Sequence, residues 1–196
     1  MLNMKRQLLV ATLSLAALAL AGCSSSGTGS SGGTSTTVPS HSAVLGATTA
    51  AWDAGHPQGS NATSFGPKVK VHGAEVDQYH SVSTANGRIT GWQMYFPTST
   101  RLGAAESMVR AQLPADSRQT ASWRGSFAGG GYCEFVNYAS ASLATNLGTT
   151  STAEGGSNIG VKLFDSAANG AKKASIAHVN SAVVGTTPFT VGQPCG

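Results

Sequence analysis

The first 40 residues constrain this chain more than any other feature, because they decide where it folds and how much of it remains to fold. A positively charged start, Met1–Arg6, leads into an uncharged apolar run of 13 residues, Leu8–Leu20. As a helix with about 1.5 Å rise per residue, this run reaches roughly 20 Å, short of the roughly 30 Å hydrocarbon core of a bilayer. The layout is typical of a removable signal peptide over residues 1–22. Residues 24–40 are almost entirely Ser, Gly and Thr and predict a flexible tether, which leaves residues 41–196 for a single domain.

The end of the apolar run, Leu20-Ala21-Gly22-Cys23, resembles the lipobox of bacterial lipoproteins, in which small residues precede a lipidated cysteine. The resemblance implies that Cys23 carries a thioether-linked diacylglycerol and becomes the mature N-terminus, at the head of the tether over residues 23–40. Each buried CH₂ group contributes about 0.8 kcal/mol, so two or more acyl chains would hold the chain on the extracytoplasmic face of a cell membrane. The resemblance covers residues 1–23 alone. In composition, the Ala, Gly and Thr-rich remainder resembles lipoproteins of actinobacterial-type envelopes.

The charge of the chain gives no reason to expect a nucleic-acid partner. The formal net charge is +4, and it falls to +2 without Lys5 and Arg6. Only Lys172 and Lys173 are then adjacent basic residues, whereas a surface that tracks phosphates needs clustered Lys and Arg. A formal dinucleotide-binding pattern, Gly27–Gly32, lies in the tether without a strand before it, so we expect no cofactor.

Two cysteines remain in the predicted domain, Cys133 and Cys195. A chain destined for an oxidising compartment favours a disulfide between them. The alternative, a reactive or metal-binding pair of thiols, lacks the CxxC spacing or a neighbouring His that such sites use.

The clearest local structure is a β-hairpin over Asp77–Phe96, because Asn86-Gly87 supplies the positive φ angles of a two-residue type I′ turn. This register pairs Tyr79 with Met94 and Ser81 with Trp92, and it places these residues with Phe96 on one face, which we assign to the core. The opposite face is predicted to be partly wet and carries His80, Val82, Thr84, Ile89, Gln93 and Tyr95.

Other segments alternate with period two or show helical spacing. Helices are predicted from Leu102 to Leu113, capped by Ser99 or Thr100 and ended by Pro114; over Leu45–Ala54, with Trp52 buried and Gly55 ending it; and over Ser140–Leu147. Strands are predicted at Thr120–Arg124, at Tyr132–Tyr138, around Ile159, Val161 and Leu163, and at Ser175–Val184, with a turn at Asn169-Gly170.

This order of elements predicts an α+β fold, an antiparallel sheet with two or three packed helices. A doubly wound parallel sheet does not fit, since strands and helices do not alternate regularly. A helix followed by a β-hairpin could occur twice, and such a duplicated unit resembles small two-repeat envelope domains such as the β-lactamase-inhibitor-like fold.

The densest group of possible metal ligands is His72, Glu75, Asp77 and His80, four residues within nine positions. In a strand Glu75 and Asp77 would share one face, where a metal ion could recruit a nearby His. The alternative interpretation is a solvated strand edge and a loop.

Three further features are candidate sites. Asp53 and His56 could form an acid–base pair, or a local contact at a helix end. Gly129–Gly131 could bind an anion through its backbone, or form a loop or bulge. Trp123, next to Arg124 and a glycine-rich loop, is the indole most open to a ligand, whereas Trp52 and Trp92 belong to the predicted core.

Two classes of function remain. The first is a non-catalytic module of the cell envelope that binds a protein, a glycan or a lipid, favoured by the anchor, the tether and the missing catalytic motifs. The second is an extracytoplasmic enzyme whose site, which could depend on a metal, lies around His72–His80. An enclosed cavity or exposed apolar patch would favour the first class, and converging His and carboxylates would favour the second.

Overall fold

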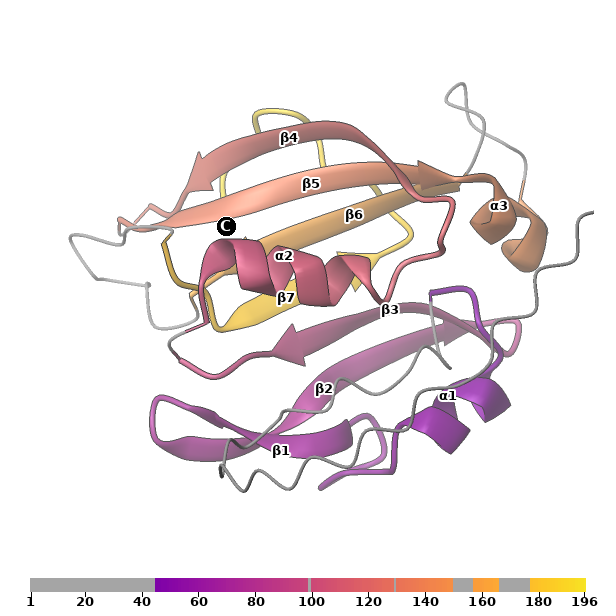
Figure 1. Ribbon diagram of the computed structural model, residues 1–196. Coiled ribbons are helices and arrows are strands. Elements are labelled where there is room, and N and C mark those ends of the chain that lie inside the picture. The colour runs from indigo at the N-terminus through magenta and orange to yellow at the C-terminus, as the bar shows by residue number, and fades with distance from the viewer. Residues whose placement is uncertain (1–44, 99, 129, 150–156, 166–176) are drawn as a thin grey trace, which may run out of the picture. The chain divides into compact units, whose positions relative to one another are not determined.

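A seven-stranded antiparallel sheet, in the order β1-β2-β3-β7-β6-β5-β4, is the main element of the structure (Figure 1). The computed structural model describes residues 45–98, 100–128, 130–149, 157–165 and 177–196. The predicted signal peptide and tether (residues 1–40), Ser99, Gly129 and the turn at Asn169-Gly170 lie outside these residues. The strands are β1 (Phe65–Val71), β2 (Ala74–Ala85), β3 (Arg88–Tyr95), β4 (Arg118–Ser126), β5 (Tyr132–Ser140), β6 (Ser157–Phe164) and β7 (Ser181–Gly185).

In the part of the chain that the structure describes, three short helices accompany the sheet: α1 (Thr49–Gly55), α2 (Leu102–Arg110) and α3 (Ala141–Leu147). Side-chain caps begin two of them: Thr48 accepts a hydrogen bond from the Ala51 amide, and Ser140 accepts one from the Leu143 amide. The fold is therefore α+β with an antiparallel sheet and three helices, as predicted. The duplicated helix-plus-hairpin unit is not confirmed, because α1 is followed by three strands and α2 by two.

The main core lies between the helices and one face of the sheet, here called the α2 face. Period-two alternation gives this face Trp92 and Met94 of β3 and Val161 and Leu163 of β6, all at most 2% exposed. Trp52, Val109 and Leu143 from α1, α2 and α3 belong to the same cluster. All three helices therefore bury their apolar sides against one face.

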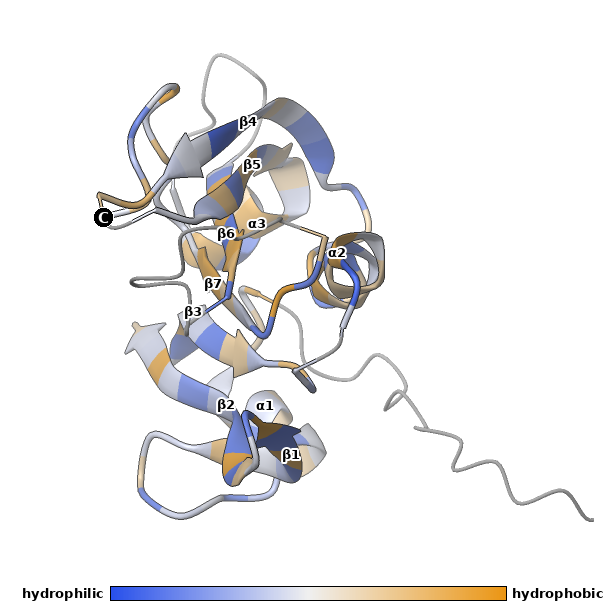
Figure 2. Ribbon diagram, turned by 90° about the vertical axis from the view of Figure 1, so that its left-hand side faces the viewer, coloured by the Kyte–Doolittle hydropathy of each residue, from blue (hydrophilic) through white to orange (hydrophobic). Residues whose placement is uncertain are grey.

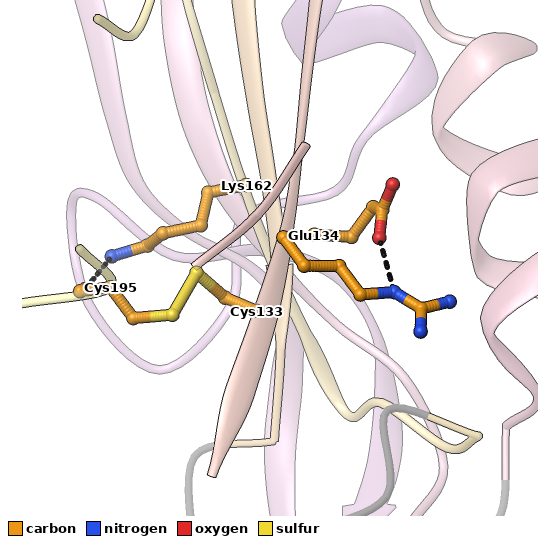
Figure 3. The surroundings of a disulfide bond; sticks show 5 residues. Cys133, Glu134, Lys162 and Cys195 are labelled. Atoms are coloured by element: carbon orange, nitrogen blue, oxygen red, sulfur yellow. Dashed lines mark hydrogen bonds and ion pairs between the residues drawn. A yellow bond between two sulfur atoms is a disulfide. The ribbon is translucent and has the colours of Figure 1, made fainter. Parts of the chain in front are cut away.

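The opposite face of the sheet is covered by the C-terminal segment, residues 186–196, which lies across the sheet from α2 (Figure 2). The side chain of Asn137 on β5 donates to the Phe189 carbonyl at 2.8 Å and accepts from its amide at 3.0 Å. The predicted disulfide is confirmed, with the Cα atoms of Cys133 and Cys195 5.9 Å apart. Figure 3 shows this bond on one side of β5, beside Lys162, whose ammonium donates to the Cys195 carbonyl at 3.2 Å.

The predicted hairpin is confirmed, with one local correction. Tyr79 pairs with Met94, and both turn residues, Asn86 and Gly87, have positive φ angles of 51° and 69°. The register is irregular between His80 and Thr84, where Ser81 has a φ of 51°, so the predicted pair of Ser81 with Trp92 does not form. A second register shift, between Ser83 and Thr84, puts an extra residue of β3 between Ile89 and Gly91. Ile89, predicted on the wet face, is therefore part of the main core and 1% exposed.

The helix boundaries also differ from the predicted ones. In α2, Ala105 and Val109 are buried as predicted, but Arg101 occupies the N-cap without a side-chain bond, and Thr100 instead donates to the Pro97 carbonyl. The helix ends at Arg110, before Leu113 and Pro114.

The first helix begins at Thr49 rather than Leu45, because Gly46 has a φ angle of 86°, which a right-handed helix does not contain. The Gly46 amide bonds to the Ile89 carbonyl at 2.9 Å. The last strand described begins at Ser181. Of the predicted strand Ser175–Val184, residues 175–176 lie outside the described residues, and residues 177–180 come before β7. None of the helices in the described part of the chain is long and apolar enough to cross a membrane.

Candidate functional site

The four candidate metal ligands do not converge. Asp77 is buried and bound to Lys68 at 2.7 Å and to the Ser60 amide at 2.9 Å. These hydrogen bonds, led by that of Lys68, lower the pKa of Asp77 to about 2. Glu75 is exposed, and Nδ1 of the His80 ring lies 2.9 Å from the Ser81 hydroxyl. Among the residues described, no three His, Cys, Asp or Glu side chains are placed to hold a metal ion.

His72 joins a different cluster, which the sequence did not suggest. Its Nε2 lies 3.2 Å from an Asp165 carboxylate oxygen and 2.6 Å from the side-chain amide of Asn180, which is fully buried. Asn180 also donates to Asp165 at 2.9 Å. This cluster joins the β1–β2 turn to the end of β6 and the start of β7. Its side chains bond to one another and so have a structural role.

Asp53 and His56, the proposed acid–base pair, line a hollow of about 400 Å³ together with Gln58, Ala62 and Phe65. The His56 ring is buried and stacks on Trp52 with centroids 3.9 Å apart, and Nδ1 lies 3.0 Å from the Trp52 carbonyl. Since a carbonyl only accepts, Nδ1 carries the proton. Burial lowers the pKa of His56, against the opposing effects of this hydrogen bond and of Asp53. The imidazole is therefore neutral near pH 7 and held by packing.

The remaining sequence candidates lie beside the C-terminal segment or in a turn. Trp123 is half-buried, and one face of its ring stacks on Phe135 with centroids 5.1 Å apart. Gly130 and Gly131 have φ angles of 91° and 98°, and their backbone bonds to Phe127 close the β4–β5 turn. These glycines act there as turn residues.

A polar pocket of about 190 Å³ lies between α2 and the β4–β5 hairpin. We call it the α2–β5 pocket. Its lining residues are Glu106, Ser107 and Arg110 of α2, Gln119 and Ser122 of β4, and Glu134, Val136 and Tyr138 of β5. Acidic, basic, amide and hydroxyl groups thus meet in one place.

Simple periodicities bring these side chains together. Glu106 and Arg110 are four residues apart and so lie on the same side of α2. On β5, Glu134 alternates with the residues that face the C-terminal segment, and it points away from the disulfide (Figure 3). In the β4–β5 register Ser122 is opposite Val136, which places it on the α2 face. The pocket forms where the apolar α2 face ends and polar β4, largely blue in Figure 2, begins.

Two carboxyl groups meet in this pocket under different conditions. Glu134 is 15% exposed and accepts a hydrogen bond from Arg124 Nε at 3.2 Å. Glu106 has no such partner among the contacts described. Burial and then the charge of Glu134 raise the pKa of Glu106, and Arg124 opposes this shift. One carboxylate is therefore held as an ion pair, while the other is the more easily protonated.

Tyr138 adds a buried hydroxyl group to the pocket lining. Its side chain is 6% exposed. Burial raises the pKa of Tyr138, with the charges of Arg110 and Glu106 acting in opposite directions. The phenol is therefore neutral across the physiological range and can either donate or accept a hydrogen bond.

Adjacency along the sequence does not reveal this pocket, because its residues come from three separate elements. One signal was available: Glu134 stands in a strand whose neighbours Cys133, Phe135 and Val136 are apolar, and an acidic residue in such a strand needs a partner or a function. The partner elements could not be identified without the fold. Comparison of the chain with protein-family models, with curated proteins and with solved structures found no match.

Proposed function

We propose that this chain is a lipid-anchored extracytoplasmic protein whose folded domain binds a small hydroxyl-bearing ligand, such as one sugar residue of a glycan, in the α2–β5 pocket. The anchor is carried by the lipobox-like residues before Cys23 and by the Ser, Gly and Thr-rich tether that follows. The intramolecular disulfide fits an oxidising compartment.

The proposed class of ligand is based on the side chains that line the α2–β5 pocket. Its groups are mostly polar, which disfavours the acyl chain of a lipid. Glu106 and Glu134 can accept from hydroxyl groups, while Arg110 and Gln119 can donate. The lining has two glutamates and one arginine, and Arg124 outside it pairs with Glu134, so two cations face two carboxyl groups and a neutral polyol fits better than an ion. The volume of about 190 Å³ lies below the roughly 300–1,000 Å³ of pockets for drug-sized ligands, which favours a single sugar unit.

The test is native mass spectrometry of the full chain, exported in bacteria and incubated with an envelope glycan digest. The wild type should retain a saccharide mass that denaturation releases. Hydrogen bonds to charged groups contribute about 1.5–3 kcal/mol, so Glu106→Gln and Glu134→Gln should each weaken retention by tenfold or more. Glu75→Gln, an exposed carboxylate of β2, is the matched control and should not change retention.

Two results would reject the binding proposal. One is a folded wild type that retains no saccharide at any concentration. The other is retention that survives both Glu106→Gln and Glu134→Gln, which would place the ligand elsewhere on the molecule.

The enzyme alternative is favoured by one observation, the unequal carboxyl groups of Glu106 and Glu134. Burial and the charge of Glu134 raise the pKa of Glu106, while Glu134 is ion-paired with Arg124, and two carboxyl groups in such unequal environments can divide the roles of general acid and of base or nucleophile in glycoside hydrolysis. The same experiment separates the two functions, because an enzyme would shorten the added glycan with time and a binding module would return it unchanged.

A further inference from the structure

A second hollow, of about 240 Å³, lies where the β2–β3 turn, the end of α3 and the segment after β7 meet. We call it the Arg88 site. Its lining consists of Ala85, Asn86, Arg88, Thr90, Asn146, Leu147, Thr149 and Thr186. Among these described residues one is a cation, three are threonines, two are asparagines and none is acidic. The Arg88 site is thus chemically unlike the α2–β5 pocket, which holds two carboxyl groups.

Arg88 itself is half-buried and held in place. Its Nη1 donates to the Gly46 carbonyl at 3.0 Å, which fixes the guanidinium but leaves its charge uncompensated. In the part of the chain that the structure describes, Arg88 forms no ion pair with a carboxylate. A guanidinium has five N–H donors in a planar fork, so several donors remain for a ligand.

The walls of the Arg88 site are held by backbone hydrogen bonds. Thr186 donates through its amide to the Thr90 carbonyl at 3.0 Å, which joins the segment after β7 to β3. The Thr149 amide donates to the Ala144 carbonyl at 3.0 Å and, with Gly148, caps the last turn of α3. The capped carbonyls reduce the negative potential that a helix C-terminus would otherwise place there. The site is therefore preformed, so little conformational entropy is lost when a ligand binds.

We infer that the Arg88 site binds a small oxyanion, a phosphate or sulfate group, which Arg88 contacts through its fork and the threonine and asparagine side chains contact with neutral donors. An uncompensated, oriented guanidinium prefers such groups because two parallel N–H donors match two of their oxygens. The volume of the hollow takes one such group with room for a substituent. This inference is independent of the proposed function, since the two sites share no residue.

The test is isothermal titration calorimetry of the full chain in detergent with sodium phosphate at constant ionic strength, with sodium chloride as the reference salt. Wild type should show one saturable site for phosphate and none for chloride. Arg88→Gln should weaken binding at least tenfold, and Arg88→Lys, which keeps the charge but loses the fork, should have intermediate affinity. Lys70→Gln removes one exposed positive charge of β1 and should bind like wild type.

A second variant covers the case in which Arg88→Gln does not fold, since Arg88 also bonds to Gly46. Thr186→Val keeps the shape of the side chain and removes its hydroxyl, so a severalfold loss of phosphate affinity is expected. Absence of saturable binding in the folded wild type overturns the inference, and so does wild-type affinity in both Thr186→Val and a folded Arg88→Gln.

Glycerol 3-phosphate distinguishes the two sources of such a group. Tighter binding of this monoester than of inorganic phosphate would identify an esterified phosphate, as in a lipid headgroup or a sugar phosphate. Tighter binding of inorganic phosphate would identify the free anion. Both results support the Arg88 site. A loss of saccharide retention in Glu106→Gln would concern the α2–β5 pocket alone and would leave the Arg88 site unaffected.

Discussion

At Gly160 the C-terminal segment approaches the sheet so closely that no other residue fits. A β-carbon at Gly160 would overlap the Thr187 carbonyl oxygen and lie 3.0 Å from the Phe189 ring. At Gly125 a β-carbon would lie 2.9 Å from Phe135 and 3.1 Å from the Cys195 sulfur. Both glycines are required by close packing, not by a turn.

We therefore expect Gly160→Ala to destabilise the fold, because either the segment or β6 must shift. Overpacking of this kind costs about 1–3 kcal/mol. Gly103→Ala in α2 is the matched control, since nothing lies within 4 Å of its β-carbon, and Ala in a helix is favoured over Gly by roughly 0.5–1 kcal/mol. Urea unfolding should show opposite shifts of the midpoint, and equal shifts would contradict the packing role of Gly160.

Asp116 gives the fold a dependence on pH. Its carboxylate accepts from the Ser140 and Ser142 hydroxyls at 2.7 and 2.6 Å and from the Ser142 amide at 2.9 Å. Desolvation acts to raise the pKa of Asp116, but the hydrogen bonds from Ser142 and Ser140 outweigh it and lower the pKa from 3.8 to about 2.

Because the folded pKa of Asp116 is the lower one, its stabilisation is present above pH 4 and is lost as the pH falls towards 2. Asp116→Asn should thus lower the free energy of unfolding at pH 7 by more than it does near pH 2. Glu75→Gln, which removes an exposed carboxylate, is the control. Chemical denaturation at both pH values measures the free energy of unfolding of each variant. An equal loss in Asp116→Asn at pH 7 and near pH 2 would refute this role.

At the scale of elements, local patterns predicted most of the structure. The β2–β3 hairpin, the buried side of α2 and the short helix α3 all follow from spacing within one segment. The misplaced features depend on contacts with other segments. Ile89 is buried because the register between β2 and β3 shifts beside it, and α2 starts without the predicted cap because Leu102 bonds to the Ala177 carbonyl at 3.1 Å. Such contacts have no periodic signal.

The disulfide joins the C-terminal segment to β5, and its effect can be measured by substitution. Closing a loop of 62 residues contributes about 4 kcal/mol on the chain-entropy model. Cys133→Ser and Cys195→Ser should lower the melting temperature by similar amounts, and the double variant should be no worse than either alone. Additive losses would show that the two cysteines act separately.

At the scale of the whole molecule, the candidate site was far less predictable than the fold. The α2–β5 pocket combines α2 with two strands, and the Arg88 site combines a turn, a helix end and a loop. The sequence points to Glu134 only as an acidic residue among apolar neighbours. Neither convergence can be inferred before the strand order is known.

The proposed membrane anchor makes a prediction for the full chain. Cys23→Ser should abolish labelling with a radioactive or clickable fatty acid and should release the protein from the membrane fraction, because the thiol is the proposed acylation site. Cys195→Ser serves as the control, since it removes a different thiol and should still be labelled. Labelling that persists in Cys23→Ser would refute the lipoprotein assignment.

The position of β7 also sets the order in which this fold can assemble. Among the strands described, β7 comes last in the chain, yet it pairs with β3 on one side and β6 on the other. Until residues 181–185 emerge, β1–β3 and β4–β6 can form only two separate sheets with unpaired inner edges, a state prone to aggregation. The single sheet therefore has to wait for β7, a delay that suits the proposed export, in which the chain crosses a membrane before it folds.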